Sequence, residues 1–594
     1  MLSRRTFLGA AAASAALSPH LFGQSSRPTN ASAPATTPSS SASTRTKLQP
    51  FRYRDVKLTG GPLKEQFEAS LAFFMKLDND RMLKAYRQIT GLPAPGEDMG
   101  GWYNVGAFAP GHGLGQWISA LSRYSDATGD AAVKDKVAAL VHGLGEALAG
   151  PKPFYDGHRF KTYLYDKHVI GLTEASQLAG VSDAKDVLAR ATAQADKVLP
   201  EKALTREEMR QRPHRDISYT WDESYTLAEN LFLAHEAFGD ARYLEMAKRF
   251  LYDKPYFEPL AAGTNALVGQ HAYSHINALS SAARAHLVLG DDMHLAAARN
   301  GWRFMAAQSY ASGGWGPNEA FVEPGKGKLA DSLLGTHNHF ETPCGAYAHF
   351  KLARYLMRIT GDSAYGDSLE RMLYNGTLAA TPPRPDGSAF YYSDYHPHAQ
   401  KHFHPEKWPC CSGTYPQVIA DYLVSMYFQD DQGVYVNLYA PSELKWNDVT
   451  LTQTTDYPDS DRIAFRLGLH EPTSFAISFR IPAWAQNATL KVNGEDQRAS
   501  SGTFAKVTRA WRDGDTVQLT LPMTNRTEAI DEQHPTLVAL LRGPVLMVAV
   551  DQHLKIPRAA IPDDPAKSVA AGEVKFLPFH RVRDETYTTY FTQT

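Results

Sequence analysis

Hydrophobic residues recur at intervals of three and four along the longer, N-terminal part of the chain. From about residue 63 to residue 427 the pattern is that of amphipathic helices, as in Leu227, Leu231 and Ala234, whose side chains fall on one helix face. We therefore expect a large helical domain over this part of the chain.

A glycine followed directly by an aspartate separates successive helical stretches. Glycine can adopt the left-handed conformation that ends one helix, and aspartate caps the next. These junctions stand about 50 to 70 residues apart when a weaker one is included, enough for a helical hairpin each. Because the intervening loops are long and irregular, we expect a closed (α/α) toroid with its site at one rim, rather than an open solenoid. The junctions are Gly129-Asp130, Gly239-Asp240, Gly290-Asp291 and Gly361-Asp362, with the weaker Gly180 followed by Ser182.

Beyond about residue 433 the hydrophobic period shortens to two. Runs such as residues 434–438 and 475–479 alternate or are apolar, and Asn493-Gly494 is a typical hairpin turn,. This pattern predicts a β-sandwich. The fold class is therefore multidomain α and β, with a toroid over residues 51–430 followed by a β-sandwich over residues 431–594.

The first residues have a different pattern. Arg4 and Arg5 precede a short run of small and apolar residues, 9–17, which is typical of a twin-arginine export signal. We expect residues 1–27 to be a signal peptide and residues 28–50 to be a linker rich in Ser, Thr and Pro. The mature protein is then periplasmic or secreted. No later run of about 18 apolar residues follows, so we expect no transmembrane segment.

Composition narrows the function classes. At 594 residues the chain exceeds what one core usually supports,. Its formal net charge is -2 and it has no long basic run, so nucleic-acid binding has no support. The sequence leaves open whether two copies form a homodimer.

The three cysteines carry the strongest chemical signal, because Cys410 and Cys411 are adjacent. Secreted proteins that depend on disulfides usually have more cysteines, in even number, and neighbouring cysteines rarely bond to each other. Glu341 and Cys344 form a second pair, spaced to lie on one side of a helical turn,. One carboxylate and three thiolates complete a tetrahedral set, so we predict that these four residues bind Zn²⁺.

Two alternatives to this ligand set remain. The cysteines can be ordinary buried apolar residues beside a helix-start glutamate. A nearby histidine can also replace one ligand, and the candidates are His337, His339, His402 and His404.

A zinc-bound thiolate can also act as a nucleophile, and such chemistry needs a proton donor. Glu319 lies in the glycine-rich segment 313–321, between Trp315 and Phe321. It is our candidate for an acid that later acts as a base. Glu323 is a weaker candidate, and most loop glutamates are simply solvated.

These motifs resemble the β-L-arabinofuranosidases of glycoside hydrolase families 127 and 146, from about residue 55 to residue 550. The resemblance is carried by the following segments: Cys410-Cys411-Ser412-Gly413-Thr414, Glu341 with Cys344, Gly313 to Phe321, Gly113 to Trp117, Asp166-Lys167-His168, Val436 to Tyr439, Arg480 to Trp484, Trp511 to Asp515 and Leu541 to Pro544. One spacing departs from the family, which commonly has Glu-x-Cys where this chain has Glu-x-x-Cys.

The resemblance implies an (α/α)₆ barrel with a β-sandwich, a zinc ion held by the four predicted ligands, and a retaining mechanism. In this reading Cys410 attacks the anomeric carbon and Glu319 is the acid and base. His168, His271 and Tyr392 match positions that contact the sugar. The expected activity is zinc-dependent exo-hydrolysis of terminal β-L-arabinofuranosyl or related furanosyl residues of plant-type glycans, with an oligosaccharide or glycan as partner.

Two other functions compete with this one. Toroids followed by β-sandwiches also occur in polysaccharide lyases, which would act on uronic-acid polymers with Tyr and His and would not need paired cysteines. A carbohydrate-binding protein with a purely structural zinc would not need Glu319. Fold analogy alone does not separate these readings.

Overall fold

A computed structural model of the protein describes residues 45–211, 217–561 and 574–594. The predicted signal peptide (residues 1–27) and the linker up to residue 44 lie outside the described residues.

Six inner helices of the described chain form a closed ring. Along the chain each inner helix contacts the next, and the last contacts the first. Each inner helix also packs against one helix of an outer layer, so the predicted (α/α)₆ toroid is confirmed. The inner helices are α4 (Leu114–Thr128), α6 (Lys161–Gln177), α9 (Ala228–Phe238), α12 (Ala272–Leu289), α15 (Thr342–Thr360) and α17 (Cys411–Ala420). The outer helices are α2 (Gly61–Lys76), α5 (Ala131–Leu148), α7 (Ala184–Ala195), α10 (Ala241–Arg249), α13 (Asp292–Ala306) and α16 (Ser363–Met372).

The glycine–aspartate junctions turn the chain from an inner helix to the next outer helix, as predicted. At Gly290, for example, φ is +82°, and the Asp291 side chain accepts a hydrogen bond of 2.8 Å from the backbone N–H of Met293. The other three junctions have the same left-handed glycine and the same aspartate cap. Because all four turns lie at the C-terminal ends of inner helices, the N-terminal ends meet at the opposite rim.

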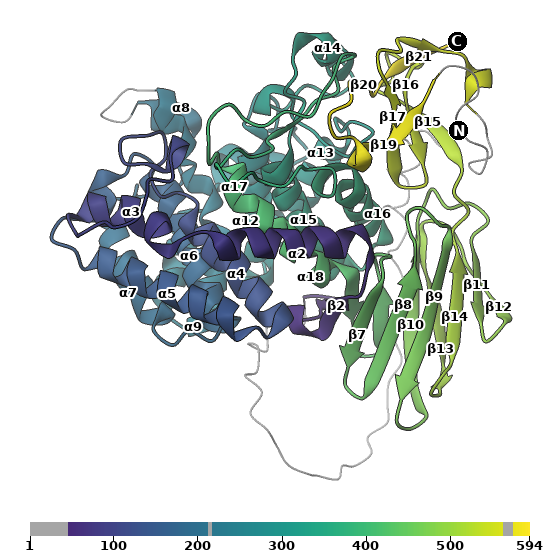
Figure 1. The fold of residues 1–594 in the computed structure, drawn as a ribbon, viewed down its shortest axis with the longest axis horizontal. Helices are drawn as coiled ribbons and strands as arrows, with labels where there is room; N and C mark the ends of the chain where they lie inside the picture. Colours follow the sequence, from purple (N-terminus) through teal and green to yellow (C-terminus); the bar gives the residue numbers. More distant parts are fainter. Residues whose placement is uncertain (1–44, 212–216, 562–573) are drawn as a thin grey trace.

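Two β-sheets form the predicted sandwich beside the toroid (Figure 1). One has the order β1-β5-β6-β10-β13 and the other the order β12-β11-β14-β9-β8-β7-β2. Their strands are β1 (Gln49–Pro50), β2 (Val56–Leu58), β5 (Tyr427–Gln429), β6 (Gly433–Val436), β7 (Ser442–Trp446), β8 (Val449–Thr455), β9 (Arg462–Leu469), β10 (Thr473–Ile481), β11 (Thr489–Val492), β12 (Glu495–Gln497), β13 (Thr503–Trp511) and β14 (Thr516–Thr520).

The structure divides the chain differently from the predicted boundaries. Residues 49–58, placed in the linker and toroid by sequence, supply β1 and β2 to the sandwich, where β2 pairs with β7. These strands are too short to show a period of two, so their partners are visible only in three dimensions.

The C-terminal residues form a third sheet instead of extending the sandwich. Its strands are β15 (Asn525–Ala529), β16 (Leu537–Arg542), β17 (Val545–Val550), β18 (Lys555–Ile556), β19 (Phe576–Pro578), β20 (Tyr587–Thr588) and β21 (Phe591–Gln593). In Figure 1 this sheet, in yellow, lies above the green sandwich.

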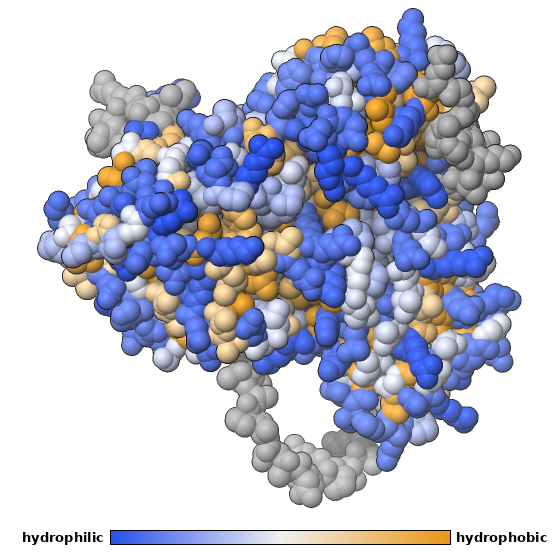
Figure 2. Space-filling view, in the orientation of Figure 1, coloured by the Kyte–Doolittle hydropathy of each residue, from blue (hydrophilic) through white to orange (hydrophobic). Residues whose placement is uncertain are grey.

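The visible face of the molecule and the apolarity of its described helices bear on the predicted absence of a transmembrane segment. Hydrophilic residues predominate on the face in Figure 2, with apolar residues scattered among them. None of the described helices combines the length and apolarity that crossing a bilayer requires,.

A buried arginine joins the sandwich to the toroid. Arg480 on β10 is 0% exposed; it contacts the carboxylates of Asp367 and Glu370 on α16, the latter at 2.8 Å, and donates to the carbonyl of Asn437 at 2.6 Å. Burial by itself would lower the pKa of Arg480, but the charges of the two carboxylates raise it above its usual range. The domain interface therefore contains a closed charge network rather than only apolar contacts.

Replacing Arg480 by Met should destabilise the whole protein by about 3–5 kcal/mol, because two buried carboxylates would lose their counter-charge. Urea unfolding followed by tryptophan fluorescence measures this effect. The matched control is Arg466→Met on the exposed face of β9, for which we expect a change within about 0.5 kcal/mol. Equal stability of the two variants would contradict the role given to the network.

Candidate active site

The main pocket opens at the rim where the inner helices begin. Its lining residues include Tyr163 in the first turn of α6 and three helix N-cap residues: His271 of α12, Glu341 of α15 and Cys410 of α17. The cavity has a volume of about 190 Å³, which is smaller than the roughly 300–1,000 Å³ of sites that enclose drug-sized ligands. Because helix N-termini carry partial positive charge, this rim favours anionic groups such as thiolates and carboxylates.

The four predicted metal ligands converge on one point beside this pocket. The Sγ atom of Cys344 lies 3.5 Å from that of Cys410 and 3.4 Å from that of Cys411. Oε1 of Glu341 lies 3.2 Å from the Cys410 Sγ and 3.8 Å from the Cys411 Sγ. All four donor atoms lie within 4.8 Å of one another.

These distances fit a single tetrahedral ion. Bonds of about 2.3 Å to sulfur and about 2.1 Å to oxygen place the ligands about 3.6–3.8 Å apart. A donor set with three thiols suits zinc. None of the three histidines His337, His339 and His404 belongs to the group of metal-ligating atoms. His337 hydrogen-bonds to Asp394 and His339 to the carbonyl of Ser332, while His404 lines the main pocket. The grouping of donors therefore matches the predicted set of Glu341, Cys344, Cys410 and Cys411.

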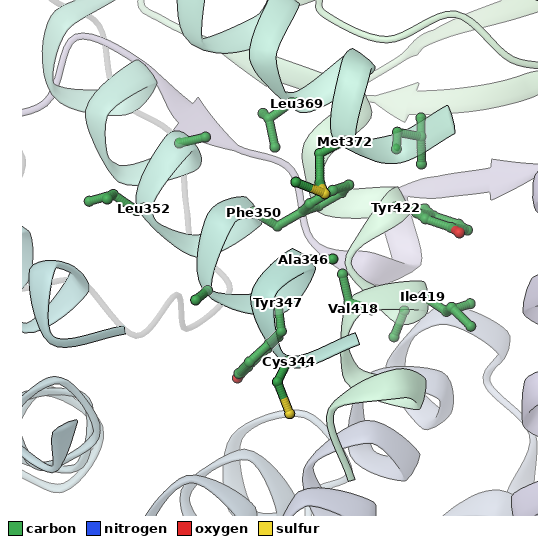
Figure 3. Close-up of a cluster of buried hydrophobic side chains, with 14 of the residues drawn as sticks. Cys344, Ala346, Tyr347, Phe350, Leu352, Leu369, Met372, Val418, Ile419 and Tyr422 are labelled. Atoms are coloured by element: carbon green, nitrogen blue, oxygen red, sulfur yellow. The ribbon is translucent and has the colours of Figure 1, made fainter. Parts of the chain in front are cut away.

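The Glu-x-x-Cys spacing is explained by a change of backbone conformation between its two ends. Glu341 still lies in the short strand β3 (Phe340–Glu341), opposite Tyr392 of β4 (Tyr392–Ser393). Pro343 then stands in the first turn of α15, and Cys344 lies one position further. Figure 3 shows Cys344 at the end of the buried cluster with Phe350 and Met372. An extended glutamate followed by a helical cysteine can reach one ion from two directions.

Cys410 is the cysteine that the pocket exposes. It is half-buried and lines the hollow, whereas Cys344 and Cys411 are buried. Burial alone would raise the pKa of Cys410, but hydrogen bonds from the neighbouring thiols and from the Tyr391 hydroxyl, 3.3 Å away, hold it well below the usual range. The site therefore favours a thiolate at Cys410, the form that acts as a nucleophile.

Glu319 faces the same pocket from a strained loop. Both Asn318 and Glu319 have left-handed backbones, with φ of +52° and +59°. The loop is held by a backbone hydrogen bond of 2.7 Å from Asn318 to Asn338. The hydroxyl of Tyr392 donates to the Glu319 carboxylate. The predicted acid and the predicted contact residue Tyr392 are thus brought together at the pocket wall.

His271 stands between the two carboxylates of the site. Its Nε2 atom lies 3.8 Å from Oε2 of Glu319 and 3.5 Å from Oε2 of Glu341. Nε2 of His271 and Oε2 of Glu341 are buried, and neither atom forms a hydrogen bond within the described residues. Since buried polar atoms are normally satisfied, these two atoms are suited to bind the hydroxyl groups of a ligand.

Glu223 is a site residue that the sequence did not reveal. Its carboxylate accepts a hydrogen bond of 2.5 Å from Nδ1 of His271, and Ser274 lies 2.9 Å from the same nitrogen. Burial would lower the pKa of His271, but the Glu223 charge and hydrogen bond raise it to about 10. Glu223 is only 3% exposed and has a left-handed φ of +35°. A lone glutamate before a helix carries no distinctive motif.

His168 requires a correction, because the structure does not bring it into the pocket. It is fully buried, with Nε2 2.8 Å from the Tyr86 hydroxyl and Nδ1 2.9 Å from the Tyr155 hydroxyl. Its ring therefore faces α3 (Asn79–Thr90) with both nitrogens occupied. In this position His168 supports the wall behind the pocket and has no free group for a sugar.

The fold and the site together define the class of a glycosidase with a helical barrel and a cysteine-rich centre. The catalytic-domain model of the GH127 β-L-arabinofuranosidases matches residues 55–423, and the middle-domain model of the same family matches residues 433–523. The chain belongs to the β-L-arabinofuranosidase family.

Similar proteins agree with this assignment. A non-reducing end β-L-arabinofuranosidase of Bifidobacterium longum is 23% identical over 290 residues, which is 44% of this chain and 43% of that protein. A solved GH127 β-L-arabinofuranosidase of Geobacillus stearothermophilus is 18% identical, with a TM-score of 0.67 over 91% of this chain and 100% of its own. A solved GH127 β-arabinofuranosidase is 17% identical, with a TM-score of 0.69 over 93% and 98% of the two chains. These structures share the fold.

The purified protein should carry one metal ion per chain at the four-ligand cluster. Replacing Cys411 by Ala, or Glu341 by Gln, should remove most of this metal, since each leaves only three protein donors. Elemental analysis of dialysed protein gives the stoichiometry. His402→Ala, an exposed histidine on the neighbouring loop, is the control and should keep the ion. Full metal content in both ligand variants would show that the ion binds elsewhere.

Proposed function

We propose that the protein is a retaining exo-glycosidase that removes terminal β-L-arabinofuranosyl, or related furanosyl, residues from plant-type glycans. The observation that carries this proposal is the placing of a half-exposed thiol and a carboxylate, Cys410 and Glu319, on the walls of one pocket. Retaining glycosidases need such a nucleophile and such a proton donor on either side of the bond they cleave. The family membership supplies the furanosyl substrate class.

In the first step Sγ of Cys410 attacks the anomeric carbon. A carbon–sulfur bond forms, the bond from that carbon to the leaving oxygen breaks, and Glu319 gives its proton to this oxygen. In the second step the Glu319 carboxylate takes a proton from water, whose oxygen attacks the same carbon, and the thiolate leaves. Two displacements restore the original configuration.

The surrounding residues orient these two groups. Tyr392 holds the Glu319 carboxylate through its hydroxyl. Glu223 fixes the ring of His271, so that Nε2 faces the pocket and can donate to a sugar hydroxyl. A zinc ion, if bound by Glu341 and the three cysteines, would keep their thiols deprotonated. We propose zinc as the cofactor from this donor set.

Hydrolysis of an aryl β-L-arabinofuranoside by the mature, metal-loaded protein tests the proposal. Cys410→Ala and Glu319→Ala should each lower kcat/KM by about a thousandfold or more, because each removes a reacting group. The control Glu323→Ala changes an exposed glutamate of the same loop and should keep full activity. Proton NMR should show the β-anomer as the first product, and mass spectrometry a glycosyl adduct on Cys410.

Other outcomes would point to the competing functions. An ultraviolet-absorbing unsaturated product from a uronic-acid polymer would indicate a lyase. Sugar binding without turnover, unchanged in Glu319→Ala, would indicate a binding protein with a structural metal ion. Activity retained in Cys410→Ala would contradict the thiolate mechanism.

We also propose that the protein is exported by the twin-arginine route. Replacing Arg4 and Arg5 together by Lys should leave most of the protein in the cytoplasm of a host with that route, because the signal depends on paired arginines. Cell fractionation and immunoblotting measure the distribution, with Arg27→Lys as the control. Unchanged export of the double variant would contradict the proposal. Light scattering of the purified protein measures whether it forms a homodimer.

A further inference from the structure

A continuous wall of aromatic rings extends along the pocket from the nucleophile. The Tyr391 hydroxyl lies 3.3 Å from Sγ of Cys410, and its ring centroid lies 4.9 Å from that of His404. The His404 ring lies 5.6 Å from Trp102, and Trp102 lies 4.6 Å from Phe108. All five residues line the pocket.

The same wall runs beside the proton donor. The ring of Tyr391 lies 4.4 Å from that of Tyr392, whose hydroxyl holds Glu319. The part of a substrate that accepts the proton of Glu319 is the leaving group. A leaving group directed along this wall would reach His404 first and then Trp102.

Trp102 is fixed in place while its ring stays half-exposed. Its backbone N–H donates to the carbonyl of Lys407 at 3.0 Å, and its Nε1 donates to the carboxylate of Glu406. The preceding Gly101 has a φ of +53°, and a Cβ atom there would lie 2.1 Å from the Lys407 carbonyl oxygen. Only glycine allows this approach, so the loop backbone holds the indole in the lining of the pocket.

The wall formed by Trp102, Phe108 and His404 consists mainly of ring surface. Part of the lining carries the carboxylates, His271 and the thiol, and another part carries the half-buried rings of Trp102, Phe108 and His404. Nearby Val105 is 47% exposed. Binding of a ring to such a surface is favourable, because its flat apolar face displaces water from the surface.

We infer that Trp102, with Phe108 and His404, forms the leaving-group subsite of this enzyme and selects leaving groups that contain a ring with a flat apolar face. This inference rests on the proposed function. The ring can belong to a second sugar or to a phenol, since both offer such a face. A leaving group without a ring gains nothing from the wall.

Three substrates with the same β-L-arabinofuranosyl group test the inference: a methyl glycoside, a phenyl glycoside and an arabinofuranosyl disaccharide. Trp102→Ala should lower kcat/KM by about tenfold on at least one ring-containing substrate, mainly through KM, as expected for a lost stacking contact. On the methyl glycoside, the kcat/KM of the variant divided by that of the wild type should stay near one. Trp102→Phe keeps a ring and should recover most of the loss.

The matched control is Trp446→Ala, a half-buried tryptophan of β7 far from the pocket, which should leave all three ratios near one. A loss on the phenyl glycoside alone would assign the subsite to phenols, and a loss on the disaccharide alone to sugars. Equal losses on all three substrates, or none, would overturn the inference. Failure of the wild type to cleave any of them would instead refute the proposed function.

Discussion

The convergence of three thiols and one carboxylate at the start of two inner helices is the constraint on which the rest of the site depends. Four donor groups that can each carry negative charge lie within 4.8 Å of one another, and such an arrangement requires positive charge or shared protons. Helix N-termini supply part of this charge, and a metal ion bound by the four groups would supply the rest. Oε1 of Glu341 faces the sulfur atoms while Oε2 turns towards His271, so the cluster also fixes which atoms face the pocket.

Segments far from the pocket in sequence hold its loops. The Tyr587 hydroxyl donates to the carbonyl of Asp394 at 2.7 Å, and Tyr587 also pairs with Ala399 through its backbone. The Tyr590 hydroxyl accepts from the N–H of Ala311 at 2.7 Å. Both tyrosines belong to the C-terminal segment after the matched family domains, and their partners flank the loops that carry Tyr392 and Glu319. The third sheet thus stiffens the walls on which the acid is mounted.

The sequence predicted those features that local chemistry determines. Gly290 with Asp291 and its counterparts gave the hairpin ends because helix caps depend on neighbouring residues. The ligand set was visible because Cys410 and Cys411 are adjacent and rare. By contrast, Glu223 meets His271 only because the loop before α9 and the start of α12 share one rim. His168 was misplaced because a motif gives a position along a helix but not which neighbours fill the space around it.

Backbone strain gives an independent view of where function lies. Among the described residues, most non-glycine positions with positive φ are asparagines or an aspartate, which tolerate the left-handed region,. The exceptions are Glu223, Glu319 and Trp408. The first two line the pocket, and Trp408 stands two residues before Cys410, with its indole donating to the carbonyl of Met99 at 2.8 Å. Such conformations cost of order 1–3 kcal/mol each and persist only where the surroundings enforce them. Their restriction to this rim means that the fold spends stability on positioning Glu319, the Glu223 carboxylate that orients His271, and the backbone just before Cys410, which are the groups that the proposed double displacement uses.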